Sequence, residues 1–171
     1  MDTKIIGLIG SMYFAGFAIS CLIVPPLSDK HGRKKPYVLS LTVQLLAYIL
    51  IFFSKNIWIT ILGYLIVGLC AGGRVATGTA YENEYVPYKY QALVIGVIGV
   101  GDASTMLFQA IYYWFLPNWL YLHIFGICAS FVLILFILTI PESPKYLYAN
   151  SRFNETRDVL KTIAKYNNAE I

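Results

Sequence analysis

Two charged residues lie inside apolar stretches, where no water is expected to reach them. Arg74 lies within the run from about Trp58 to Tyr81, and Asp102 lies within the run from about Ala92 to Leu116. A charge at the centre of a membrane-spanning helix costs at least ~2.5–3.5 kcal/mol on insertion scales, so such residues are usually retained for function. Each lies about eleven residues from the polar break between the two runs, which corresponds to ~16 Å of helix and a depth near the bilayer midplane.

This placement leaves two chemistries open. In one, Arg74 and Asp102 form a buried ion pair that neutralises both charges. In the other, which we favour, they face a water-filled cavity and bind a polar solute or relay a proton. Gln109 follows Asp102 by about two helical turns, on the same face, and extends the polar stripe. Gln44 is a weaker candidate whose amide bonds a neighbouring helix, and His123 is interpreted as a satisfied interfacial histidine rather than a proton switch.

Catalytic and metal-binding patterns are absent from the sequence. It contains no GxSxG, HExxH or P-loop motif, and its three cysteines have no metal-ligand spacing. We therefore expect no enzymatic activity, no metal and no cofactor. Nucleic acid is not an expected partner.

The composition indicates which solvent surrounds the chain. Of its 171 residues, 58% are hydrophobic and only 13% are charged, whereas a soluble domain carries about 25% charged residues. Five apolar runs are long enough to cross a bilayer, which takes about 20 residues. They cover approximately Ile5–Leu27, Tyr37–Phe53, Trp58–Tyr81, Ala92–Leu116 and Leu120–Ile140. The sequence therefore predicts an all-α polytopic membrane protein whose main partner is the lipid bilayer.

The positions of lysine and arginine predict the orientation. The breaks at 28–36, 82–91 and 141–145 fall on one side of the membrane, and those at 54–56 and 116–118 fall on the other. Most of the 13 basic residues lie on the first side, namely Lys30, Arg33, Lys34, Lys35, Lys89, Lys145, Arg152, Arg157, Lys161 and Lys165. By the positive-inside rule, that side is cytoplasmic.

Small residues recur at the spacing of packed helices. They form a ladder at Gly7, Ser11 and Ala15 and a GxxxG pair at Gly68 and Gly72, with more glycines on the fourth run at positions 96, 99 and 101. In lipid, small residues let two helices approach closely. We expect all of them to serve helix packing within the bundle.

The chain changes character after the fifth run. Apolar or near-apolar residues at positions 153, 156, 159, 160, 163 and 164 follow a helical period, with a charged opposite face. This pattern predicts a cytoplasmic amphipathic helix that lies on the bundle or on the lipid headgroups. We accordingly divide the chain into a five-helix transmembrane bundle, residues 1–147, and a cytoplasmic amphipathic helix, residues 148–171.

The polar stretch "SDKHGRKK" at 28–35 resembles the loop between the second and third helices of major facilitator transporters. The family pattern there is Gly-x-x-x-Asp-(Arg/Lys)-x-Gly-(Arg/Lys)-(Arg/Lys). Pro25 replaces the leading glycine of that pattern. The pattern is matched by Asp29, Lys30, Gly32, Arg33 and Lys34.

Two further stretches carry the same resemblance. "PESPKYL" at 141–147 looks like the signature that ends the sixth helix of sugar porters and organic-ion transporters, and the tail that follows is more similar to the organic-ion branch. That signature is matched by Pro141, Glu142, Ser143 and Pro144. Glu84 and Pro87 match the Glu-x-x-Pro of the loop between the fourth and fifth helices. Two arginines of the family are replaced here, by Tyr64 and Gln91, and Arg74 and Asp102 match no family motif.

The resemblance implies helices two to six of a twelve-helix transporter that moves a small-molecule solute by alternating access. Arg74, Asp102 and Gln109 are then expected to line the solute site. The matched motif residues and Glu84 are expected to form a cytoplasmic gate. The family suggests the plasma membrane, and the expected partner is a second half of the transporter or a second polypeptide. Two alternatives are a degenerate, transporter-like subunit of a membrane complex and a sugar porter.

Overall fold

Seven helices make up the described part of the chain. The computed structural model describes residues 3–116 and 118–167. The helices are α1 (Thr3–His31), α2 (Lys34–Phe53), α3 (Ile57–Tyr85), α4 (Tyr88–Phe115), α5 (Trp119–Thr139), α6 (Pro144–Ala149) and α7 (Phe153–Tyr166). The first five are long and apolar enough to cross a membrane. The predicted class, an all-α polytopic membrane protein, is confirmed.

Capping residues set several of the helix starts. The side chain of Asn56 accepts from the backbone N–H of Trp58 at the start of α3, and Asn118 accepts from Leu120 at the start of α5. Ser143 caps α6 in the same way. These side chains satisfy backbone donors that the first turn of a helix leaves free.

The first polar break is much shorter than the sequence suggested. We expected a loop at 28–36, but α1 continues to His31 and α2 begins at Lys34, so only Gly32 and Arg33 lie outside the helices. Polar residues at the end of a span can stay helical because water solvates their side chains. The chain turns at Gly32, whose φ of +98° is readily adopted only by glycine.

The tightest helix packing joins α1 to α3. A Cβ atom at Gly68 would overlap the backbone carbonyl of Tyr13, and one at Gly16 would overlap the carbonyl of Leu65. A Cβ at Gly72 would likewise lie 2.9 Å from the carbonyl oxygen of Phe17, so the packing role predicted for Gly68 and Gly72 is confirmed. The glycines at positions 7, 96, 99 and 101 have nothing within 4 Å of a built Cβ, so the packing expected there is not formed within the described chain.

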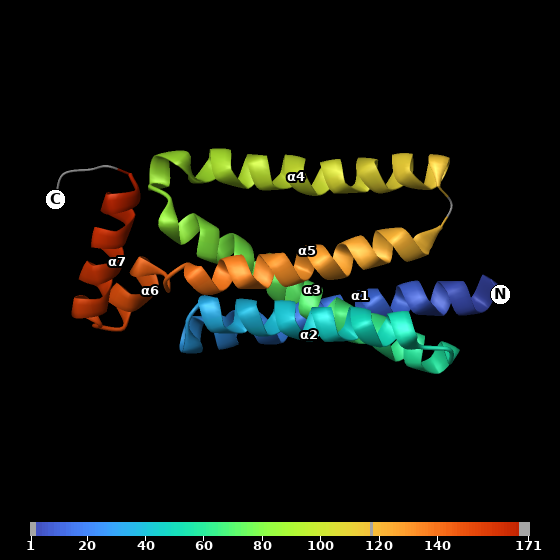
Figure 1. Cartoon of the computed structure of the whole chain (residues 1–171). Helices are drawn as coiled ribbons and strands as arrows, with labels where there is room; N and C mark the ends of the chain where they lie inside the picture. Colours follow the sequence, from blue (N-terminus) through green and yellow to red (C-terminus); the bar gives the residue numbers. More distant parts are fainter. Residues whose placement is uncertain (1–2, 117, 168–171) are drawn as a thin grey trace.

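Helix α4 stands apart from the other spans. Figure 1 shows it lying at a distance from α1, α2 and α3 along most of its length, and α4 has no buried residue. By contrast, α3 buries residues along most of its length against α1 and α2. Helix α4 therefore contributes no buried residue to the packed core of the described chain.

The C-terminal helices lie at the end of the bundle where α1, α3 and α5 finish, which we call the basic end. Figure 1 shows α7 running across the ends of the spans, next to α6. In α7, Thr156 and Val159 are buried, whereas Phe153 and Leu160 are 58% and 52% exposed. The predicted amphipathic helix is present as α7, and residues 168–171 of the predicted segment lie outside the described residues. The division at residue 147, which falls inside α6, remains a prediction.

Candidate functional site

A cavity of about 630 Å³ lies among the five spanning helices, and every span contributes to its lining. The predicted residues Arg74, Asp102 and Gln109 all line it, from α3 and α4. Most of the other lining side chains are aromatic or aliphatic, and they include Tyr64, which stands where the family has an arginine. The three polar residues that the sequence singled out thus share one space at mid-span.

Arg74 and Asp102 do not neutralise one another. Arg74 is half-buried and Asp102 is exposed, and neither side chain makes a hydrogen bond or ion pair in the described part of the chain. The buried ion pair considered above is therefore not formed. An unpaired charge far from bulk water is stable only where water or a polar ligand reaches it. The arrangement favours a hydrated cavity with one positive and one negative group on different helices.

Gln44 and His123 meet at Tyr48 on the α2 and α5 wall of the cavity, and the expectation that the Gln44 amide bonds a neighbouring helix is wrong, because its partner lies on α2 itself. Gln44 donates through Nε2 to Tyr48 Oη at 3.1 Å, and His123 Nε2 lies 2.9 Å from the backbone carbonyl oxygen of Tyr48. Gln44 and His123 both line the cavity. The Oε1 atom of Gln44 is buried without a hydrogen-bond donor in the described residues. The sequence analysis named Gln44 and His123 separately but not their shared contact with Tyr48, for which the four-residue spacing of Gln44 and Tyr48 was the available signal.

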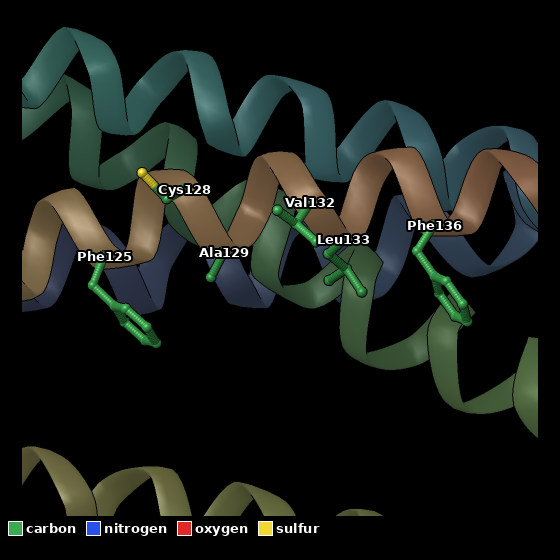
Figure 2. A pocket seen from close by; sticks show the side chains of 6 residues that line it. All are labelled: Phe125, Cys128, Ala129, Val132, Leu133 and Phe136. Atoms are coloured by element: carbon green, nitrogen blue, oxygen red, sulfur yellow. The ribbon is translucent and has the colours of Figure 1, made fainter.

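A second hollow, of about 600 Å³, runs along α5 and is apolar. Figure 2 shows its lining side chains on α5 alone, with Phe125 and Phe136 extending toward the side where α4 lies. It offers no charged group and no hydrogen-bonding side chain other than the thiol of Cys128. A polar solute therefore has partners in the first cavity and not in this hollow.

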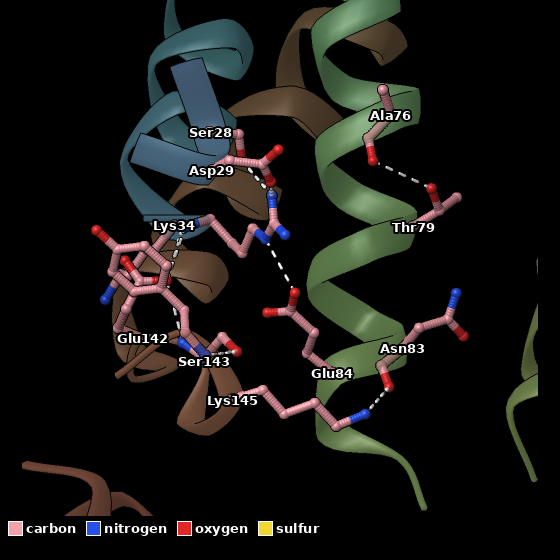
Figure 3. A network of polar contacts seen from close by, with 12 residues as sticks. Ser28, Asp29, Lys34, Ala76, Thr79, Asn83, Glu84, Glu142, Ser143 and Lys145 are labelled. Atoms are coloured by element: carbon pink, nitrogen blue, oxygen red, sulfur yellow. Dashed lines mark hydrogen bonds and ion pairs between the residues drawn. The ribbon is translucent and has the colours of Figure 1, made fainter. Parts of the chain in front are cut away.

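A polar network at the basic end gathers most of the motif residues. The Arg33 guanidinium donates to Asp29 Oδ1 and, through Nε, to Glu84 Oε1 at 3.0 Å. The side chains of Arg33 and Glu84 are only 19% and 17% exposed. Burial acts to lower the pKa of Arg33, but the hydrogen bonds and charges of Asp29 and Glu84 outweigh it, so that pKa is raised. Figure 3 shows Asp29, Glu84 and Glu142 close together at this end.

Glu142 connects the α5–α6 corner to the start of α2. Its Oε1 accepts backbone N–H bonds from Arg33, Lys34 and Ser143, each at 3.0 Å. A carboxylate at a helix N-terminus satisfies free donors and complements the helix dipole. A Cβ at Gly32 would lie 2.6 Å from Glu142 Oε2, so only glycine leaves room for this contact.

Further bonds at the basic end join α3 to the same corner. Tyr81 and Tyr85 both donate to the carbonyl oxygen of Pro141. Lys145 donates to the carbonyl oxygen of Asn83 at 3.4 Å (Figure 3). Gln91, which replaces a family arginine, donates to that same Asn83 carbonyl at 3.0 Å. The Asn83 carbonyl near the C-terminus of α3 therefore has donors although the arginine is missing.

The remaining motif residues contribute through backbone carbonyls, side-chain donors and the ring of a proline. Tyr146 donates to the carbonyl oxygen of Lys30 at 3.0 Å, and Lys34 Nζ donates to the carbonyl oxygen of Leu138 at 2.8 Å. Pro144 occupies the first turn of α6, where its missing N–H costs nothing. The structure thus brings all three resembling stretches, 28–35, 84–87 and 141–147, to one end of the bundle.

Comparison with known proteins gives the family. A family model described as "Sugar (and other) transporter" matches residues 2–170. The chain belongs to this transporter family. The resemblance to major facilitator transporters is therefore confirmed, and the protein is an integral, multi-pass membrane protein.

Individual relatives come from both branches of the resemblance. The chain is 32% identical to organic cation/carnitine transporter 7 of Arabidopsis thaliana over 168 residues, which cover 96% of this chain and 33% of that protein. It is 30% identical to probable inositol transporter 3 of the same plant, covering 91% of this chain and 28% of that one. It is 28% identical to glucose transporter GlcP of Staphylococcus epidermidis, covering 96% and 37%. The chain thus spans about a third of the length of these relatives.

Proposed function

We propose that this chain forms part of a secondary transporter that moves a small polar or organic-ion solute across a membrane by alternating access. The observation that carries the proposal is the pair of unpaired charges, Arg74 and Asp102, on the wall of a cavity between spanning helices. In transporters of this kind the solute is held near the midplane, at the interface between two repeats. Membership of a transporter family supports the same conclusion.

The two charges suggest how the solute is held. Arg74 offers donors to a carboxylate, hydroxyl or carbonyl oxygen of the solute, and Asp102 accepts from an ammonium or hydroxyl group. Gln109 adds one amide on the Asp102 helix. Because the cavity lining is otherwise largely aromatic and aliphatic, these few polar groups determine the orientation of the solute.

The network at the basic end joins several helices into a unit that can move during transport. Arg33, Glu84 and Glu142 join the ends of α1, α2, α3 and α6, so these helices can move as one body. Alternating access is largely such a rigid-body motion of one repeat against another. The opposing body is a second half of the protein or a second polypeptide, and the family suggests the plasma membrane.

Two other functions remain candidates. A transporter-like subunit of a membrane complex is favoured by the replacement of two family arginines, at Tyr64 and Gln91. A sugar porter is favoured by the relatives named for glucose and inositol.

Solute uptake tests the proposal. The protein is purified from its native membrane, with any polypeptide that remains bound, and is reconstituted in liposomes with radiolabelled L-carnitine, D-glucose or myo-inositol. We expect uptake of at least one solute, and a loss of at least tenfold in Arg74→Ala and Asp102→Asn. Arg157→Ala and Asp158→Asn, which remove the same charges from α7, serve as matched controls. Unchanged uptake in the cavity variants would reject the roles of Arg74 and Asp102. Absence of uptake together with a stoichiometric membrane complex would favour the subunit.

A further inference from the structure

We propose that His123 is a solute-binding residue whose Nδ1 atom accepts a hydrogen bond from a hydroxyl or N–H group of the solute. The inference rests on the proposed function, because it takes the cavity among the spans as the solute site. It adds a hydrogen-bond acceptor on the α2 and α5 wall of that cavity. It also narrows the solute to one that carries a donor.

The contact with Tyr48 determines which nitrogen of His123 carries the proton. The Nε2 atom lies 2.9 Å from the backbone carbonyl oxygen of Tyr48. A carbonyl oxygen only accepts hydrogen bonds, so Nε2 must carry the hydrogen. In the neutral ring the other nitrogen, Nδ1, then holds a lone pair. Nδ1 has no hydrogen-bond partner among residues 3–116 and 118–167.

Three aromatic rings hold the imidazole in this orientation. The ring of Phe52 lies nearly parallel to it, with an interplanar angle of 9°, and the rings of Tyr48 and Trp119 meet it edge-on. Tyr48 is itself fixed by the hydrogen bond from Gln44. A ring held by contacts on several sides presents its free nitrogen in one direction, which lowers the entropic cost of binding a ligand there.

The same wall carries a second acceptor that lacks a donor. Gln44 is 4% exposed and lines the cavity, and its Oε1 atom is buried without a partner in the described residues. Buried acceptors of this kind are usually satisfied by protein, water or ligand. Two acceptors near Tyr48 favour a solute with donor groups at that end, while Arg74 on α3 suits an acceptor elsewhere on the same molecule.

Nuclear magnetic resonance of the histidine nitrogens tests the tautomer directly. The chain has 2 histidines, so a His31→Gln variant labelled with 15N-histidine reports His123 alone. We expect a protonated Nε2 and an unprotonated Nδ1 at pH 8. We also expect the Nδ1 signal to shift when a solute that binds the protein is added. A proton on Nδ1, or an Nδ1 signal that moves with none of L-carnitine, D-glucose and myo-inositol, would overturn the proposal.

Two variants separate binding from structure. In His123→Gln the side-chain nitrogen can replace Nε2 and still donate to Tyr48, but the Nδ1 acceptor is lost. In His123→Asn the polar group lies near the Nδ1 position and the bond to Tyr48 is lost. We expect His123→Gln to keep the melting temperature and to raise the KM for uptake roughly fivefold to tenfold, the loss of one hydrogen bond. We expect His123→Asn to melt at a lower temperature and to retain more of its solute affinity.

The outcomes distinguish the two proposals. Uptake by the unmodified protein with an unchanged KM in His123→Gln means that His123 is only structural, and the inference fails while the proposed function stands. If the unmodified protein takes up none of the three solutes, the proposed function is rejected. The nitrogen signals then still decide whether His123 contacts one of those molecules.

Discussion

Charged side chains have protein partners at the basic end of the bundle, but Arg74 and Asp102 in the cavity at mid-span have none in the described chain. At the basic end, Arg33 is bonded to Asp29 and Glu84, and Glu142 accepts three backbone donors. At mid-span, Arg74 and Asp102 face a cavity and have no partner in the described chain. Paired groups stabilise the arrangement of helices, whereas unpaired groups cost stability, and under the proposed function Arg74 and Asp102 serve to bind the solute. Substitutions at four positions test this contrast.

The largest effect is expected at Glu142. Glu142→Ala removes the acceptor of three backbone N–H groups and leaves those of Arg33 and Lys34 without a partner at the start of α2. We expect a loss of about 3 kcal/mol, since each partly buried donor left unsatisfied carries a desolvation cost. The apparent melting temperature in detergent micelles, followed by circular dichroism, measures it. Glu142→Gln retains one acceptor oxygen and should lose less than half as much; equal losses would mean that the side-chain oxygen is unimportant.

A smaller effect is expected at Arg33. Arg33→Ala leaves the largely buried Glu84 without its cation, and we expect a loss of about 2 kcal/mol. Arg33→Lys should recover only part of it, because one ammonium group cannot match the separate directions of Asp29 and Glu84. Both are measured as melting temperatures beside the unmodified protein. A fully stable Arg33→Ala variant would contradict the assignment of this pair to structure.

The pH dependence of the stability that Arg33 contributes follows from its raised pKa. A cation whose pKa is higher in the folded state stabilises the fold below its ordinary pKa and stops doing so only as pH rises through the raised value. Both values lie well above neutral pH. The difference in melting temperature between Arg33→Ala and the unmodified protein should therefore be the same at about pH 6 and pH 9.

At mid-span, removing a charge is expected to leave the stability unchanged or to increase it, the opposite of the effect at the basic end. Arg74→Ala removes a half-buried charge that has no partner in the described residues, so stability should stay level or rise by up to about 1 kcal/mol. Uptake, in contrast, should fall. Arg157→Ala on the surface of α7 is the matched control and should change neither. A marked loss of stability in Arg74→Ala would show that the arginine serves the fold, and the contrast between the two regions would disappear.

The spanning helices and the charged residues within them could be predicted from residue types alone. The five spans and the two midplane charges were found because a bilayer penalises polar groups so strongly that exceptions stand out. The contact between His123 and Tyr48 could not be found this way, because it depends on how α2 packs against α5 across 75 residues of chain. Glu142 was identified by resemblance, but its partners are backbone N–H groups, which leave no mark on the residue types of Arg33 and Lys34. The length of the first loop was overestimated because polar residues there were taken as non-helical.

The smallest effect is expected at Gln91, where the family has an arginine. The Gln91 amide already donates to the Asn83 carbonyl at 3.0 Å and also reaches the Val86 carbonyl, at 3.5 Å. Gln91→Arg can make the same bonds and adds a charge near the C-terminus of α3, where the helix dipole favours cations. We expect a gain within about 0.5 kcal/mol, whereas Gln91→Ala should lose about 1 kcal/mol by freeing both carbonyls. If Gln91→Arg also leaves uptake unchanged, the basic end requires a hydrogen-bond donor at position 91 and not a positive charge. A large increase in uptake would mean instead that the arginine takes part in the transport cycle, and the division between a structural end and a functional midplane would have to be redrawn.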